Sequence, residues 1–123
     1  MAKKILIIED EDILRNLLEE KLKQKGYDVS VAKDGQEGLS VMPKIMPDLI
    51  LLDIIMPKVN GFEVMEKMQK SPNLKEIPVI IVSNSGQPVE IDRAKKLGVK
   101  DWLIKTQFDP QEVIQKVIKQ IGK

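Results

Sequence analysis

Residues 5–10 read Ile-Leu-Ile-Ile-Glu-Asp, four aliphatic side chains in succession and then two acids. A short run of consecutive aliphatic residues is typical of a parallel strand buried on both faces, because helices cover both sides of such a sheet. The same arrangement returns at residues 49–53, where Leu-Ile-Leu-Leu precedes Asp53, and residues 79–83 read Val-Ile-Ile-Val-Ser. These segments predict three central strands of one parallel sheet, each ending at a polar residue.

Five helices and two weaker strands are predicted around these segments. Residues 28–32 alternate weakly, as expected of a strand near an edge, and residues 102–104 form a short last strand. Pro43 falls in the last turn of the second helix, which is therefore expected to be short or kinked. The residues expected to face the core from the helices are Ile13, Leu14, Leu17, Leu18 and Leu22; Gly38, Leu39 and Met42; Phe62, Met65 and Met68; Ile91, Ala94 and Leu97; and Val113, Ile114, Val117, Ile118 and Ile121.

Strands and helices alternate strictly along the chain. This predicts a parallel sheet covered by helices on both faces, with right-handed crossovers. We therefore expect an α/β fold, a three-layer sandwich of the flavodoxin-like (βα)5 type. Periodicity alone does not give the order of the strands. A length of 123 residues suits one domain, expected to span residues 1–123.

The composition excludes several kinds of chemistry. The chain has no Cys and no His, so disulfides, thiolate or imidazole metal sites, cysteine nucleophiles and Ser-His-Asp triads are ruled out. The 20 Lys and Arg residues oppose 19 Asp and Glu residues, which suggests neither a nucleic-acid surface nor a membrane surface. No apolar run is long enough to span a bilayer, and the first residues do not form a signal peptide. We expect a cytoplasmic protein that contacts neither nucleic acid nor membrane.

Polar side chains stand where four of the predicted strands end. They are Glu9 and Asp10, then Asp53, Ser83 and Lys105. Alone, each has an ordinary structural reading: Asp10 as a helix cap, Ser83 as the start of a turn and Lys105 as a solvated lysine. The carboxyl ends of parallel strands meet at one edge of the sheet, where folds of this kind bind ligands. We therefore expect the five side chains to converge.

Convergence of Glu9, Asp10 and Asp53 calls for a cation, because neighbouring carboxylates disfavour one another's ionised forms. Ligands that are all oxygen favour Mg²⁺, Mn²⁺ or Ca²⁺, and few carboxylates with room for water and phosphate oxygens favour Mg²⁺. Lys105 could then neutralise a phosphate, and Ser83 could donate a hydrogen bond to it. Aspartate carboxylates form acyl phosphates, so Asp53 is the expected nucleophile.

Taken together, the motifs resemble those of the receiver domains of two-component response regulators, such as the single-domain chemotaxis regulators. The resemblance covers the full length and implies the strand order 2-1-3-4-5. It rests on residues 5–10, 51–57 (Leu-Leu-Asp-Ile-Ile-Met-Pro), 60–61 (Asn-Gly), 79–83 and 103–105 (Leu-Ile-Lys). The spacings also fit the family: 43 residues from Asp10 to Asp53, a further 30 to Ser83 and a further 22 to Lys105.

The resemblance implies a phosphoacceptor and a metal site. Asp53 would accept a phosphoryl group from a sensor histidine kinase, a phosphotransfer protein or a small phosphodonor. Glu9, Asp10, Asp53 and the backbone carbonyl of Ile55 would bind Mg²⁺, for which Mn²⁺ could substitute. Such a protein is a signalling phosphoacceptor and no enzyme for other substrates; it catalyses only its own phosphorylation and dephosphorylation.

The resemblance also implies a switch. Ser83 and Lys105 would contact the phosphoryl group, and Ser83 together with Trp102 would couple it to the face of the fourth helix, fifth strand and fifth helix. A downstream protein would bind that face, and the chain would be a monomer or a phosphorylation-dependent dimer. Trp102 also has a simpler reading, as a partly buried anchor.

Three residues depart from the family pattern. Thr106 follows Lys105 where the family usually has proline, often after a cis bond; because a cis bond to threonine would cost about 3 kcal/mol, we expect a trans peptide. Asn84 stands where small residues are common and is expected to narrow access to the site. Ile55 places an apolar side chain near the path of an attacking water, and we hypothesise slow self-dephosphorylation.

Other functions stay open at this point. One is a receiver-like interaction module that does not depend on phosphate, against which the intact Asp10, Asp53, Ser83 and Lys105 argue. Another is a phosphatase with an aspartyl nucleophile, although such enzymes often carry a second Asp where this chain has Ile55. A nucleotide-binding domain is disfavoured, because no G-x-G-x-x-G or Walker motif is present. No DNA-binding segment follows the last predicted helix, so we expect the output through another protein.

Overall fold

The computed structural model describes residues 2–84, 86–105 and 109–122. Strands and helices alternate along the chain, as predicted. The strands are β1 (Lys4–Ile8), β2 (Asp28–Ala32), β3 (Leu49–Leu52), β4 (Val79–Ser83) and β5 (Asp101–Ile104), and the helices are α1 (Asp12–Gln24), α2 (Gly35–Ile45), α3 (Gly61–Gln69), α4 (Pro88–Lys96) and α5 (Pro110–Ile121).

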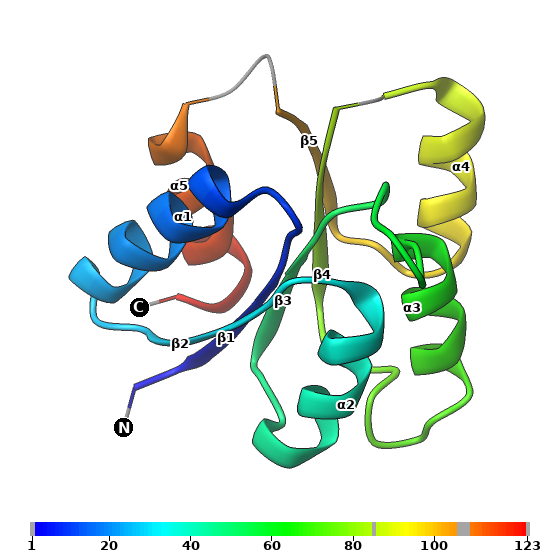
Figure 1. Cartoon of the computed structure of the whole chain (residues 1–123), viewed down its shortest axis with the longest axis horizontal. Coiled ribbons are helices and arrows are strands. Elements are labelled where there is room, and N and C mark those ends of the chain that lie inside the picture. Colours follow the sequence, from blue (N-terminus) through cyan, green and yellow to red (C-terminus); the bar gives the residue numbers. More distant parts are fainter. Residues whose placement is uncertain (1, 85, 106–108, 123) are drawn as a thin grey trace.

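The strands form one parallel sheet in the order β2-β1-β3-β4-β5. This confirms the α/β, flavodoxin-like three-layer sandwich and the strand order. Helices α1 and α5 cover one face of the sheet, and α2, α3 and α4 cover the other (Figure 1). The strand order reverses at β1 and β3, which lie side by side in the centre of the sheet. The carboxyl ends of these two strands form the topological switch point where ligands bind in this kind of fold.

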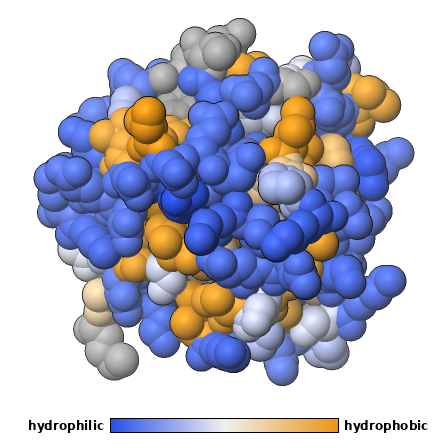
Figure 2. Space-filling model, viewed as in Figure 1, coloured by the Kyte–Doolittle hydropathy of each residue, from blue (hydrophilic) through white to orange (hydrophobic). Residues whose placement is uncertain are grey.

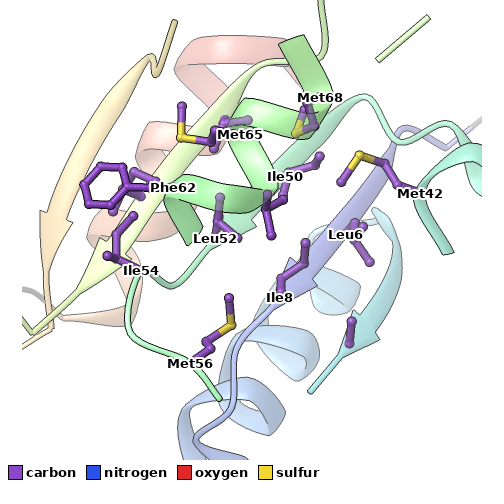
Figure 3. Close-up of a cluster of buried hydrophobic side chains, with 14 of the residues drawn as sticks. Leu6, Ile8, Met42, Ile50, Leu52, Ile54, Met56, Phe62, Met65 and Met68 are labelled. Carbon is purple, nitrogen blue, oxygen red and sulfur yellow. The ribbon is translucent and has the colours of Figure 1, made fainter. Parts of the chain in front are cut away.

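Alternation along each strand divides the interior into two separate cores. Ile5 and Ile7 of β1 pack in a cluster with residues of α1 and α5. Leu6 and Ile8 point the other way, into a cluster with residues of α2, α3 and α4. Figure 3 shows that second cluster, in which the thioethers of four methionines lie among aliphatic side chains: Met42, Met56, Met65 and Met68. Because both faces of the sheet are covered, its central strands are apolar at every position.

One prediction about the helices needs correction. Ile13 was expected on the buried stripe of α1, but it is 86% exposed. Nine residues separate it from the buried Leu22, a rotation of roughly 180° around a helix, so the two cannot share a face. Pro43 lies in the last turn of α2, as predicted, and the helix ends two residues later at Ile45; a kink at Pro43 stays a prediction. The other residues predicted to face the core are buried or partly buried.

Local signals set the start of α3. The side chain of Asn60 accepts a hydrogen bond from the amide of Glu63, and the carboxylate of Glu63 accepts one from the amide of Asn60. This reciprocal capping box satisfies two backbone donors at the helix start. It fixes the end of the β3–α3 loop, which begins at Asp53, to Asn60.

On the face seen in Figure 2, apolar surface forms several small patches separated by hydrophilic side chains. The large apolar side chains that are exposed among the described residues are Ile13, Met46, Ile55 and Val89. None of the described helices has both the length and the apolar composition needed to cross a bilayer.

Candidate functional site

Backbone hydrogen bonds extend the sheet past its strands and fix the residues that follow them. These bonds run from the amides of Glu9, Asp53 and Lys105 to the carbonyls of Ala32 (3.0 Å), Ile8 (2.9 Å) and Ser83 (2.7 Å), respectively. The backbone of Glu9, Asp53 and Lys105 is therefore held by hydrogen bonds to neighbouring strands, although these residues lie outside the strands themselves.

Three carboxylates meet at this edge of the sheet. Glu9, Asp10 and Asp53 each offer one oxygen, and these oxygens all lie within 4.8 Å of one another. Glu9 is 2% exposed and Asp53 is 3% exposed, whereas Asp10 lies at the surface. The structure thus brings together the three acids that the sequence singled out as metal ligands.

Lys105 reaches into the same cluster from the end of β5. Its ammonium group donates to carboxylate oxygens of Glu9 (2.8 Å), Asp53 (3.1 Å) and Glu11 (3.1 Å). The Lys105 side chain is 6% exposed, so its ammonium group is largely buried and each of its three contacts is a charge-assisted hydrogen bond. The lysine partly balances a site that would otherwise hold uncompensated negative charge.

Burial and neighbouring charges shift the pKa values of Asp53 and Lys105. Burial raises the pKa of Asp53 from its ordinary 3.8 to about 8, and the charge of Glu9 adds to this rise against the opposing effect of Lys105. Burial by itself would lower the pKa of Lys105. The hydrogen bond with Glu9 and the charges of Asp53 and Glu9 outweigh burial, so the pKa of Lys105 lies above its ordinary value.

The raised pKa of Asp53 predicts a pH-dependent stability. Between pH 4 and pH 8 the folded protein keeps a proton on Asp53 that the unfolded chain has lost, so stability falls as the pH rises. In metal-free buffer with a chelator, we expect the free energy of unfolding to fall by about 2 kcal/mol or more across this interval. The charged groups that face Asp53 in this cluster are Glu9, Asp10 and Lys105. Urea unfolding at a series of pH values measures the effect.

Asparagine at this position separates the contribution of Asp53 from that of other acids. Asp53→Asn cannot ionise, so its stability should change much less over the same pH range. Asp92→Asn is the matched control, because Asp92 is an exposed aspartate on α4 and its replacement should leave the pH dependence in place. An unchanged pH dependence in Asp53→Asn would contradict this prediction.

The donor atoms at this edge fit a hard divalent cation. All are carboxylate oxygens, and two of the three acids are buried, as expected of a Mg²⁺ or Mn²⁺ site with open positions for water. Ile55 lies on the β3–α3 loop and is 63% exposed. Ligation by its backbone carbonyl stays a prediction.

Ser83 lies on β4, which pairs with β3, and Trp102 lies on β5, one strand further from the acids. Ser83 is fully buried at the end of β4 and pairs in register with Ile104 of β5. Trp102 is half-buried, packs against the cluster under α3 and α4, and lines a surface hollow with Ile91 and Val99. Thr106 lies outside the described residues, and so does the peptide bond expected to be trans.

Sequence reasoning missed two residues at this site. Glu11 contacts Lys105, but in a run of four acids nothing distinguished it from a solvated residue. Arg15 is buried and donates to the backbone carbonyl of Glu9 (2.9 Å). Its signal was present, because Arg15 stands on the same helical stripe as Leu18 and Leu22, where a charged residue is unusual.

Known proteins similar to this chain share both its sequence pattern and its fold. The family described as "Response regulator receiver domain" matches residues 5–118. RpaA of Synechocystis, named a DNA-binding dual master transcriptional regulator, is 35% identical over 114 residues, which cover 93% of this chain and 47% of that protein. The chain spans about half the length of the curated relatives it matches.

Two solved structures extend the comparison. The chemotaxis protein CheY4 of Vibrio cholerae superimposes with a TM-score of 0.91 at 26% identity, over 98% of this chain and 100% of that one. The Mn(2+)-bound form of the response regulator Rcp1 superimposes with a TM-score of 0.83 at 27% identity, over 96% of this chain and 93% of that one.

Proposed function

Because the chain belongs to the receiver domain family of two-component response regulators, we propose that it is a phosphorylation-dependent switch whose phosphoacceptor is Asp53. One observation carries this proposal: the buried carboxylate of Asp53 lies 3.1 Å from the ammonium group of Lys105 and beside the carboxylates of Glu9 and Asp10. Receiver domains are phosphoacceptor signalling modules. That this chain catalyses its own phosphorylation and dephosphorylation is part of the proposal.

The proposed reaction is a displacement at phosphorus. A carboxylate oxygen of Asp53 attacks the phosphohistidine of a sensor kinase or phosphotransfer protein. An O–P bond forms while the N–P bond breaks, and the imidazole leaves with the bonding electron pair and takes up a proton. Lys105 neutralises charge on the phosphoryl oxygens, and the hydroxyl of Ser83 donates a hydrogen bond to one of them. These 123 residues contain no His, so the phosphohistidine donor lies outside them.

The proposed cofactor is Mg²⁺, held by Glu9, Asp10, Asp53 and the backbone carbonyl of Ile55. When bound, the ion would supply positive charge for the phosphoryl oxygens. The all-oxygen donor set supports this assignment. The Mn(2+)-bound form of the similar Rcp1 supports Mn²⁺ as a substitute.

The proposed output runs through Ser83 and Trp102 to the face made by α4, β5 and α5. A half-buried Trp102 beside a surface hollow supports this route, because a change in the position of its ring would alter that face. The phosphorylated chain then binds a downstream protein, as a monomer or a dimer. That the 123 residues act as a single domain and contact no nucleic acid stays a prediction; RpaA, a longer relative, is named as DNA-binding.

Phosphate uptake tests this function directly. With Mg²⁺ and acetyl phosphate, the wild type should gain the mass of one phosphate, Asp53→Asn should gain none, and the control Asp92→Asn should behave as the wild type. No uptake by the wild type from acetyl phosphate or from any kinase would favour a phosphate-independent interaction module. Multiple turnovers with general phosphomonoesters would favour a phosphatase.

A further inference from the structure

Arg15 is a buried cation that the proposed phosphoryl transfer does not use. It lies in the first turn of α1, its side chain is 11% exposed, and Leu18 and Leu22 lie buried on the same stripe. Burying a guanidinium group is costly unless its donors are paired. The partners of Arg15 therefore indicate what the group does.

The guanidinium group of Arg15 has two partners of different kinds. One nitrogen donates to the carboxylate of Asp12 at 2.5 Å, but Asp12 is 76% exposed. The other nitrogen donates to the backbone carbonyl of Glu9 at 2.9 Å, in a buried hydrogen bond. That carbonyl belongs to the peptide unit joining Glu9 to Asp10, at the corner where β1 leads into α1 (Figure 1).

Fixing this carbonyl fixes the direction of two carboxylates. A peptide unit is planar and contains the Cα atoms on both of its sides. Its orientation therefore helps to set where the side chains of Glu9 and Asp10 point. Glu9 is also held elsewhere, because its carboxylate accepts from the amide of Glu11 (3.1 Å) and from Lys105 (2.8 Å). Asp10 is exposed, so the direction of its carboxylate depends more on the orientation of its backbone.

We infer that Arg15 is a positioning residue for the divalent cation of the acidic cluster. It acts by anchoring the Glu9–Asp10 peptide unit, and this inference rests on the proposed function. Neutralisation of the cluster is the task of Lys105, which contacts Glu9 and Asp53 directly. Arg15 contacts the backbone between two ligands and so sets their geometry. Groups that orient ligands in this way typically change metal affinity 10–100-fold when they are removed.

Calorimetric titration with Mg²⁺ tests the inference. Arg15→Met should bind Mg²⁺ about tenfold more weakly than the wild type. In the acetyl phosphate reaction, the Mg²⁺ concentration for half-maximal rate should rise by the same factor, while the rate at saturating Mg²⁺ is retained. A residue with only a structural role would lower stability without this separation of affinity from rate.

Two control variants separate positioning from general stability. Tyr27→Phe removes a hydrogen bond to the carbonyl of Gly122 (2.6 Å) at the other end of the sheet. Asp12→Asn weakens only the exposed contact of Arg15. Both should bind Mg²⁺ as the wild type does. Should Arg15→Met not fold, Arg15→Lys takes its place; a single ammonium group cannot hold both partners as the planar fork does, so its affinity should also fall.

The outcomes of the Mg²⁺ titrations test the inference about Arg15 separately from the proposed function on which it rests. Weaker Mg²⁺ binding in the Arg15 variant, with both controls unchanged, supports the inference. Wild-type affinity in the Arg15 variant that folds, Arg15→Met or its replacement Arg15→Lys, overturns the inference and leaves the proposed function standing. Failure of the wild type itself to bind Mg²⁺ overturns the metal site and the inference together.

Discussion

Replacing Lys105 with methionine should lower the free energy of unfolding of the metal-free protein by about 3 kcal/mol at pH 8. The ammonium group of Lys105 lies within 3.1 Å of oxygens of Glu9 and Asp53, and none of the three side chains is more than 6% exposed. Methionine fills a similar volume but leaves the buried carboxyl groups of Glu9 and Asp53 without their cation. Removing one partner of a buried ion pair is costly for that reason. Urea unfolding in the presence of a chelator measures the loss.

Mg²⁺ and a surface variant serve as controls for this prediction. Millimolar Mg²⁺ should restore much of the lost stability, because binding to the native state supplies the missing positive charge. Lys23→Met is the matched variant, since Lys23 forms an exposed ion pair with Glu19 (3.0 Å), and such pairs contribute at most about 1 kcal/mol. Equal losses in Lys23→Met and the Lys105 variant would mean that Lys105 does not stabilise the acidic cluster.

Gly61→Ala should cost about 3 kcal/mol or more of stability. Gly61 begins α3, and its amide donates to the carbonyl of Ile54 (2.8 Å). A Cβ atom built at Gly61 would lie 2.5 Å from the carbonyl oxygen of Asp53 and 2.8 Å from the Cα of Ile54. Both are backbone atoms, so the helix or the loop after Asp53 must move. Urea unfolding measures the cost, and uptake of phosphate from acetyl phosphate should fall in any protein that still folds.

Gly26→Ala is the comparison that isolates crowding. Gly26 has a φ of +97°, with nothing within 4 Å of a built Cβ. Alanine at Gly26 meets only backbone strain, roughly 1–2 kcal/mol, and should leave phosphate uptake unchanged. If Gly61→Ala costs no more than Gly26→Ala, the close approach of α3 to the loop does not constrain the site.

The fold was predictable because its strongest signals are local. Residues 5–8 and 49–52 are apolar at every position, and strands buried on both faces require this. The residue after each such strand must lie at the carboxyl edge of the sheet. Glu9 and Asp53 could therefore be placed together without knowledge of any distance. The strand order came from the resemblance to receiver domains, since periodicity carries no information about it.

The features that sequence reasoning missed depend on how far long side chains reach and which way they point. The error at Ile13 arose because several leucines nearby made the apolar stripe look wider than it is. Lys105 contacts Glu11 across the mouth of the site, and Arg15 turns back to the Glu9 carbonyl. The helical stripe could have indicated that Arg15 is buried, but the partners of these long side chains have no fixed spacing in sequence, so no pattern predicts them.

The division of the interior by the sheet gives two neighbouring reporters of the site. Leu51 packs in the cluster shared with α1 and α5, and Leu52 packs in the cluster shared with α2, α3 and α4. They are the last two residues before Asp53. Isotope-labelled methyl groups at Leu51 and Leu52 would give separate NMR signals for the two helical layers. Comparing them would show whether a chemical event at Asp53 reaches both layers or only one.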